Sequence, residues 1–594
     1  MNFLFPFLAI LAVFVTDCLG ASDYHERLDL QPLPGSSLLA SFNFRSNSSV
    51  SSFQNQHFRY FPRSLGQILQ HTLTKELHIR FTTGRWDAES WGTRPWEGYK
   101  EGATGVELWA WVEAESEKDA FAKWISLTQS LSGLFCSSLN FIDSTRTTRP
   151  VVSFEPRGDH ANSSQLHLLH GTLPGEVVCT ENLTPFLKML PCKGKAGISS
   201  LFDGHKLFDA SWQSMSIDVR PTCPSESEEC LVEIQQSVDM VMDIERSKRP
   251  RDNPIPRPVP TEKLVCDPSK PYNSDDTCYP LERKSEIGWT LSEVFGRPVK
   301  GHCPLTDEGP GSLTVCMKVP SDRSVFVTEG ASEIRGTDDE FSRCYNLPAS
   351  NDFDLVLPEE DTKTQVPLQQ EVLHTERTII GHGQERGGMR VIFRNPSAVD
   401  SVDFIYFESL PWFVRPYLHT LQATVVGNDG VIRQLPFSEI IKGIYYRPAI
   451  DRERGAQLEL VLSVPADSTV TLIYDIEKAI LRYTEYPPDA NRGFNVAPAV
   501  IRILGSENQV SIYLRTTGLL LSLPTPDFSM PYNVIILTST VMALGFGSIF
   551  NLLVRRFVPA DEPALRAYSL KARLMSRLVV LRDRFKGKTS KQTS

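Results

Sequence analysis

One apolar segment constrains this chain more than any other feature. Residues 533–554, NVIILTSTVMALGFGSIFNLLV, contain no charged side chain. At about 1.5 Å per residue, a helix of this length crosses a hydrocarbon core of roughly 30 Å. Arg555 and Arg556 follow at once, and residues 555–594 carry eleven Lys/Arg against three Asp/Glu. Because basic flanks stay cytosolic, we expect a transmembrane helix over 533–554, a basic cytosolic tail over 555–594, and a large lumenal part before the helix.

The N-terminus predicts entry into the secretory pathway. An apolar run from Phe3 to Val15 is followed by small residues, and Cys18 and Gly20 suit the −3 and −1 positions of a signal-peptidase site. The alternative is an uncleaved anchor, but thirteen apolar residues are short for a membrane span. We therefore expect a signal peptide over 1–20 and a single-pass type I topology.

Cysteine usage indicates an oxidising compartment. Ten cysteines follow the expected signal peptide, and all of them precede the membrane segment. The spacings Cys266–x11–Cys278 and Cys303–x12–Cys316 suit disulfide-stapled loops. Zinc is the alternative, but there is no close Cys-x2-Cys pair, so we expect no metal site.

Three N-glycosylation sequons lie on the predicted lumenal side, at Asn47, Asn162 and Asn182. Asn182 lies within GEVVCTENLTPFLKMLPC, residues 175–192, which also holds Cys179 and Cys192. Because the number of cysteines is even, residue counting alone favours an internal bridge for Cys179, for example to Cys192.

The lumenal part, about 510 residues, is too long for one hydrophobic core. We expect a β-rich domain over 21–245, in which ELHIRFTT, GVELWAWVEAE, VVSFEP and QLHLLHGTLP have strand character. A helix is expected over 117–133, with Ser116 as its N-cap and Gly133 at its end.

The second half of the lumenal part changes composition twice. Residues 246–365 are rich in Pro and Cys and predict an extended connector with stapled loops. Residues 366–524 contain short alternating strands such as MRVIFRNP and STVTLIYDIEKAILRY. These strands favour an antiparallel sandwich over the alternative, a barrel. The expected fold class is mainly β (α+β), with several lumenal domains, a β-sandwich near the membrane and one transmembrane helix.

Enzyme signatures are absent from the sequence: there is no G-x-S-x-G, H-E-x-x-H, P-loop or G-x-G-x-x-G. GHGQERGG, residues 381–388, has the composition of a catalytic or anion-binding loop containing His382, but we favour a glycine-rich hairpin tip. DGHKLFDASW, residues 203–212, places His205 near two aspartates, and we favour a structural turn there.

Several long phrases carry a resemblance to a known family. They are ELHIRFTTGRWDAESWG, GEVVCTENLTPFLKMLPC, GWTLSEVFGRPVKGHCPL, YTEYPPDANRGF and LPTPDFSMPYNVI. Together they resemble the PIG-T-type subunit of glycosylphosphatidylinositol (GPI) transamidase, over nearly the entire chain. That family acts in the endoplasmic reticulum membrane, where the complex cleaves a C-terminal signal from a proprotein and transfers the new carboxyl end to the ethanolamine phosphate of GPI.

The resemblance implies a non-catalytic subunit. Catalysis would belong to a separate caspase-like subunit, and this chain would stabilise the assembly and help to hold that subunit in place. The implied partners are the catalytic subunit, other membrane subunits, the GPI lipid and the proprotein signal, with no cofactor and no nucleic acid. The alternatives are a lumenal chaperone or cargo receptor for secretory proproteins, and a lumenal hydrolase using His205 or His382.

The resemblance also implies roles for particular residues. Cys179 matches the family cysteine that forms an interchain disulfide with the catalytic subunit, which would leave nine other cysteines and hence at least one free thiol. Asn491, Asp527 and Ser529 match contacts to the GPI head group; for Asp527 and Ser529, ordinary turn chemistry before a membrane helix is the alternative.

Overall fold

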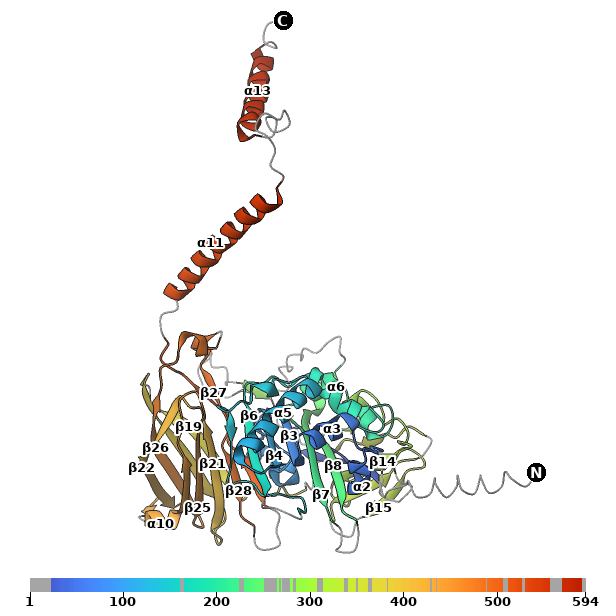
Figure 1. Ribbon diagram of the computed structural model, residues 1–594. Helices are drawn as coiled ribbons and strands as arrows, with labels where there is room; N and C mark the ends of the chain where they lie inside the picture. The colour runs from blue at the N-terminus through green and yellow to red at the C-terminus, as the bar shows by residue number, and fades with distance from the viewer. Residues whose placement is uncertain are drawn as a thin grey trace, which may run out of the picture. The chain divides into compact units, whose positions relative to one another are not determined.

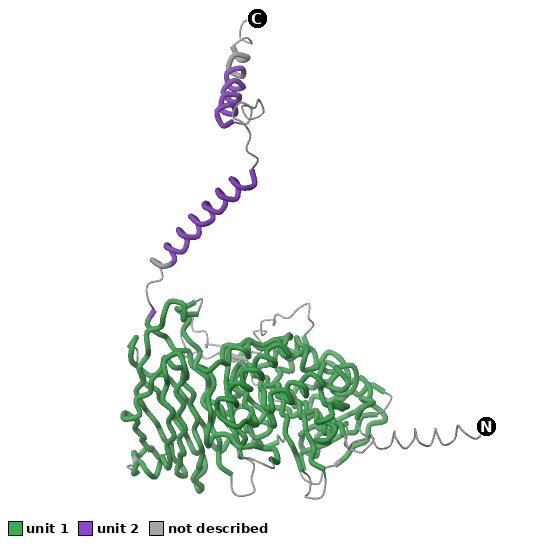
Figure 2. Tube along the Cα trace, in the orientation of Figure 1, with its two compact units in different colours: residues 1–524 green, residues 525–594 purple. Residues whose placement is uncertain are grey.

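The structure is a computed structural model, and it divides the chain into two compact units, residues 1–524 and 525–594 (Figure 2). It describes residues 23–589 with internal stretches left out, namely 161–164, 224–228, 250–263, 267–268, 270–277, 281–284, 307–312, 336–339, 349–350, 362–365, 382, 428–429, 434, 488, 506–510, 526–528 and 556–568. The signal peptide expected over 1–20 therefore lies outside the described residues.

The first unit begins with a large twisted sheet (Figure 1). All its strands pair antiparallel except β1 and β13, which are parallel. We call this sheet and its helices the N-terminal lobe. In sheet order the strands are β15 (Ser332–Arg335), β16 (Ser342–Asn346), β13 (Leu313–Lys318), β1 (Tyr24–Leu33), β2 (Ser37–Ser49), β8 (Leu231–Asp243), β7 (Trp212–Thr222), β3 (Thr74–Gly84), β4 (Gly105–Glu113), β6 (Leu166–Leu173) and β5 (Thr147–Thr148).

Both faces of this sheet are covered, which the alternation along β4 makes clear. Leu108 and Ala110 pack in the main core beneath the helices. Trp109 and Trp111 point the other way, into an apolar cluster shared with Phe407 of a second lobe. The helices over the core face are α3 (Arg63–His71), α5 (Glu117–Phe135), α6 (Thr180–Met189), α7 (Gly204–Phe208) and α9 (Leu291–Phe295).

The helix expected over 117–133 is present as α5. The Ser116 side chain accepts a hydrogen bond from the Asp119 amide, as an N-cap should. Gly133 does not end the helix; the chain continues to Phe135, and Cys136 ends it in the left-handed conformation with φ of 51°. A non-glycine residue at such a C-terminal position is uncommon, so the sequence pointed to the wrong residue.

The second lobe is an antiparallel β-sandwich, which we call the sandwich lobe. Its two five-stranded sheets enclose a separate apolar core, and the mainly β fold class expected from the sequence is confirmed. One sheet holds β19 (His374–Ile380), β20 (Arg386–Asn395), β26 (Ser468–Lys478), β22 (Val414–Gly427) and β23 (Ile432–Arg433); the other holds β24 (Ile441–Arg447), β25 (Ala456–Val464), β21 (Val402–Leu410), β28 (Val500–Ile503) and β29 (Ile512–Arg515).

Three sequence expectations need correction. VVSFEP, residues 151–156, is not a strand but an irregular segment held by the sandwich lobe. The region 246–365 is more than a connector, since β13, β15 and β16 belong to the large sheet. Cys303 and Cys316 do not bond each other: the disulfides are Cys192–Cys303 and Cys316–Cys344. Cys266 lies opposite Cys278 on two short paired strands.

The second unit contains two helices, α11 (Ser529–Val554) and α13 (Leu570–Thr589). Within α11, Tyr532–Val554 has a mean hydropathy of 1.8 and none of it is buried, so by length and composition it can cross a membrane. No other helix in the described part of the chain passes that test. The segment expected to span the membrane, 533–554, falls within it.

Candidate functional site

Cys179 immediately precedes α6 and occupies its N-cap position. Its thiol is unbonded and partly exposed. The internal bridge to Cys192 that residue counting favoured is not formed, because Cys192 is bonded to Cys303. Cys136, which is exposed, is the other free cysteine among the described residues. The extra free thiol that an interchain bond at Cys179 would require is therefore available in the fold.

The loop that leads into Cys179 is anchored on one side and exposed on the other. The Glu176 carboxylate accepts a hydrogen bond of 2.7 Å from the Ser138 amide, just beyond α5. Val178 is buried, whereas Val177 is 78% exposed. The free thiol of Cys179 therefore lies on a solvent-exposed stretch of the loop, two residues after an exposed valine.

Asn182 has a structural task that competes with glycosylation. Its Oδ1 accepts a hydrogen bond of 2.9 Å from the Cys179 amide, and its Nδ2 donates to the carbonyl oxygens of Phe135 (2.9 Å) and Cys136 (3.4 Å). The side chain is only 2% exposed. Nδ2, the atom to which a glycan would be attached, therefore already donates hydrogen bonds that connect the start of α6 to the end of α5. This geometry argues against glycosylation at Asn182.

The other two sequons differ in what can be described. Asn47 lies in β2, opposite Glu233 of β8, and its side chain is largely buried. Asn162 lies outside the described residues. Glycosylation at both positions stays a prediction.

The candidate lipid contacts are only partly described. Asn491 lies exposed in the 3₁₀ helix Ala490–Arg492, where its backbone N–H donates a hydrogen bond to the Asp489 carboxylate. Asp527 lies outside the described residues, and Ser529 begins α11 with a side chain that is likewise not described.

The two histidine-containing motifs have structural settings. GHGQERGG joins β19 to β20, which pair antiparallel, so the hairpin interpretation is confirmed, although His382 itself lies outside the described residues. In DGHKLFDASW, the Asp203 carboxylate caps α7 by accepting from the His205 amide at 2.9 Å. Among the described residues, no three His, Cys, Asp or Glu side chains are grouped to hold a metal.

Sequence reasoning missed a buried charged cluster on the face of the large sheet that carries Trp109. Both ring nitrogens of His78 lie against carboxylates, Nε2 at 2.7 Å from Glu76 and Nδ1 at 2.5 Å from Asp218. The Arg80 guanidinium also contacts Asp218 at 2.5 Å, and the Tyr99 hydroxyl lies 2.8 Å from His78 Nδ1. Its signal was visible in ELHIRFTT, where three ionisable residues alternate with apolar ones and so share one face of a strand.

This cluster is structural, because its charges are buried and paired. Burial alone would raise the pKa of Glu76, but hydrogen bonds from His160 and His78 hold it well below its usual range. Burial likewise opposes ionisation of Asp218, and the charge of Arg80 overcomes it and lowers the pKa of that carboxyl. The described members of the cluster are almost wholly shielded from solvent, so a substrate cannot reach them.

Two further buried carboxylates tie the lobes together. Glu107 of β4 bonds Arg515 of β29 at 2.8 Å and lies 3.2 Å from His170. Glu459 of β25 accepts hydrogen bonds from the backbone amides of residues 151–153. The Glu459 contacts hold residues 151–153 against the sandwich lobe, and the Glu107–Arg515 ion pair joins β4 to β29.

Comparisons with known proteins agree with the sequence resemblance. The sequence model of the family described as "Gpi16 subunit, GPI transamidase component" matches residues 8–579. The GPI transamidase component GPI16 of Saccharomyces cerevisiae is 42% identical over 615 residues, covering 98% of each chain. The human GPI-anchor transamidase component PIGT is 31% identical over 582 residues, covering 91% of each chain.

One solved structure matches only part of the chain. The collagen-binding subdomain of an Enterococcus faecalis surface protein covers 26% of this chain at 11% identity, with a TM-score of 0.18. Such a partial match adds nothing to the assignment, which rests on the family model and the full-length relatives. The chain belongs to the Gpi16 family and is a component of GPI transamidase.

Proposed function

We propose that this chain is the non-catalytic scaffold of the transamidase. It would stabilise the complex, hold the caspase-like catalytic subunit through an interchain disulfide at Cys179, and help to bind the GPI lipid. It would do so as a single-pass type I protein of the endoplasmic reticulum membrane. The cysteine and charge distributions support that orientation, since the basic residues cluster after the membrane segment and the cysteines before it.

The observation that carries the tethering role is the state of Cys179. It is free and partly exposed, it sits beside the exposed Val177, and its internal candidate partner Cys192 is already bonded. A covalent link would replace bimolecular docking by a high effective concentration of the partner. The catalytic subunit would then remain in place through repeated rounds of substrate binding and release.

Non-reducing electrophoresis of the purified complex tests the tether. The wild-type chain should run as a high-mass band that collapses on reduction, and Cys179→Ser should abolish that band. Cys136→Ser is the matched control and should retain it. A Cys179→Ser chain that migrates like the wild type contradicts the proposal, as does mass-spectrometric identification of a Cys136 peptide linked to GEVVCTENLTPFLK.

The lipid-binding role rests on the candidate contacts Asn491, Asp527 and Ser529. A carboxylate just before the membrane helix can accept hydrogen bonds from sugar hydroxyls or from the ethanolamine ammonium. Asp527→Asn should therefore reduce GPI anchoring of a reporter while the complex still assembles. Unchanged anchoring in both Asp527→Asn and Asn491→Ala would remove these residues from the lipid site.

The non-catalytic assignment is supported by the use of histidines in the fold. His78, His160 and His170 engage buried carboxylates, and His205 is part of a capped turn. Loss of anchoring in a stable, fully assembled His205→Ala or His382→Ala variant would instead favour the hydrolase alternative.

A further inference from the structure

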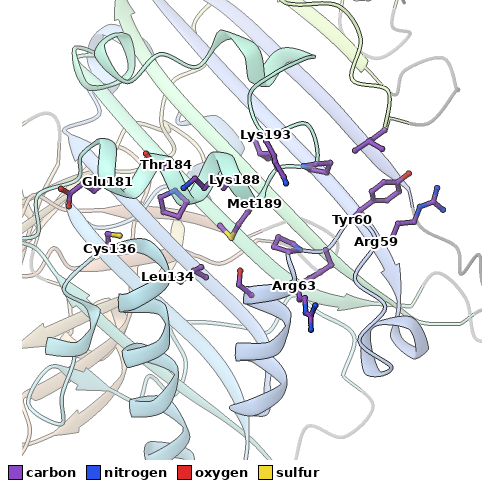
Figure 3. Close-up of a pocket in the computed structure, with 17 residues that line it drawn as sticks. Arg59, Tyr60, Arg63, Leu134, Cys136, Glu181, Thr184, Lys188, Met189 and Lys193 are labelled. Atoms are coloured by element: carbon purple, nitrogen blue, oxygen red, sulfur yellow. The ribbon is translucent and has the colours of Figure 1, made fainter.

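A surface groove is lined in part by α6, the helix whose N-cap is Cys179; Figure 3 shows the residues that line the groove. Its volume is about 850 Å³. One wall is the segment 59–64, which leads into α3; the other walls are the end of α5, α6, and the turn after α6. Leu134, Met189 and Leu305 contribute apolar surface. A groove of this size accommodates an extended ligand.

The groove is strongly basic. Arg59, Arg63, Lys188 and Lys193 line it, against the single acidic lining residue Glu181. All four cations are exposed. Arg59 stacks over the Tyr60 ring, and among the described residues none of the four is within ion-pair distance of a carboxylate. Four positive side chains against one negative side chain give the groove a net positive charge, so it would attract an anionic occupant.

The groove and the proposed tether share the same elements. Cys136 lines the groove, and the Asn182 side chain connects the Cys136 carbonyl to the Cys179 amide. Glu181 and Lys188 also line the groove, and both belong to α6, the helix that begins directly after Cys179. Cys179 itself is the N-cap of α6 and lies two residues before Glu181, so a protein bonded to its thiol would reach the surface that adjoins this groove.

We propose that the groove docks an acidic, extended segment of the same protein that is disulfide-bonded to Cys179. This inference rests on the proposed tethering function and adds a non-covalent site to it. The segment carries Asp or Glu side chains for the four cations and an apolar side chain for the surface formed by Leu134 and Met189.

The distribution of charge favours a polypeptide over a phosphate group. Figure 3 shows Arg59, Arg63, Lys188 and Lys193 spread along the groove rather than converging on one point. A phosphate site needs several donors directed at one small anion. A segment with spaced carboxylates matches cations that are spaced along a wall. An anionic lipid head group is the competing occupant, and the experiment below separates the two.

Site-directed photocrosslinking in membranes from cells that express the whole complex tests this proposal. A benzophenone amino acid replaces Leu305, which lines the groove and is 41% exposed, in the full chain with Cys179 intact. Crosslinking should give a peptide rich in Asp or Glu, from the same polypeptide that is disulfide-linked to Cys179. The double variant Lys188→Glu/Lys193→Glu should reduce its yield about tenfold, and Lys188→Arg/Lys193→Arg should not.

Lys118→Glu is the matched control, because Lys118 is exposed at the other end of α5 and should leave the crosslink unchanged. A crosslink to a glycolipid, a crosslink to a different protein, or a yield that resists charge reversal would each overturn the docking site. If the disulfide at Cys179 persists in those cases, only this inference fails. If no interchain disulfide forms at Cys179 at all, the proposed tether fails as well.

Discussion

Replacing Glu459 should release the segment that links the N-terminal lobe to the sandwich lobe. This carboxylate is 1% exposed and accepts from the amides of Val151 (2.8 Å), Val152 (2.9 Å) and Ser153 (2.9 Å), and also from the Ser153 hydroxyl. Gln457 donates to it as well. One buried carboxylate thus accepts from five donors.

The magnitude for Glu459→Gln follows from the loss of one charged oxygen. The new amide nitrogen must face donors on one side of the site, so at least two hydrogen bonds to a charged group are lost, at about 1.5–3 kcal/mol each. We expect the free energy of opening of residues 151–153 to fall by about 3–6 kcal/mol. Since 1.4 kcal/mol is a factor of ten, amide hydrogen exchange there should accelerate by roughly a hundred- to ten-thousand-fold.

Hydrogen exchange measured by mass spectrometry on the detergent-solubilised chain is the assay. Glu453→Gln is the matched control, because Glu453 is exposed on the same lobe and should change exchange at 151–153 by less than about threefold. Equal protection of this segment in Glu459→Gln and Glu453→Gln would refute the reasoning, since it would mean that Glu459 does not hold the segment.

Three further predictions concern buried groups. Burial raises the pKa of Glu26 to about 7, so the native state binds its proton more tightly, and stability should fall by about 3 kcal/mol as pH rises from about 4.5 to 7. Glu26→Gln should flatten that slope in pH-dependent urea unfolding. Arg515→Ala leaves Glu107 buried without its main partner and should cost about 3–5 kcal/mol in the same assay; a loss below 1 kcal/mol would contradict the pairing. Glycosidase treatment should leave the mass of the Asn182 peptide unchanged, whereas a shift would show that Nδ2 carries a glycan instead of bonding α5.

Local patterns predicted much of the fold. Three features could be predicted because each depends only on residues close together in the sequence. They are the charge-free segment 533–554, the strand ELHIRFTT and the N-cap at Ser116. VVSFEP alternates like a strand, but its amides bond a carboxylate some 300 residues later, and no local pattern encodes that partner.

The candidate site was less predictable than the fold. Cys179 was found only through the family phrase around it, because its chemistry depends on Cys192 being bonded elsewhere. Asn182 looks like a sugar acceptor in sequence, yet a tertiary contact with α5 consumes its amide. The groove is lined by residues from four segments, near positions 60, 135, 190 and 305. Its basic character therefore cannot be recognised from any short stretch of the sequence.

The parallel pairing of β1 with β13 has a consequence for biosynthesis. Glu26 of β1 lies opposite Leu313 of β13. Most of the lobe must therefore be translated after β1 before β13 is available to pair with it. At about 5–20 residues per second, that delay is roughly 15–60 s. Throughout this interval one edge of β1 offers unpaired amides and carbonyls, which other chains can capture. The nascent N-terminal lobe should therefore depend on chaperones, whereas the sandwich lobe, whose strands are contiguous in sequence, can close soon after it emerges.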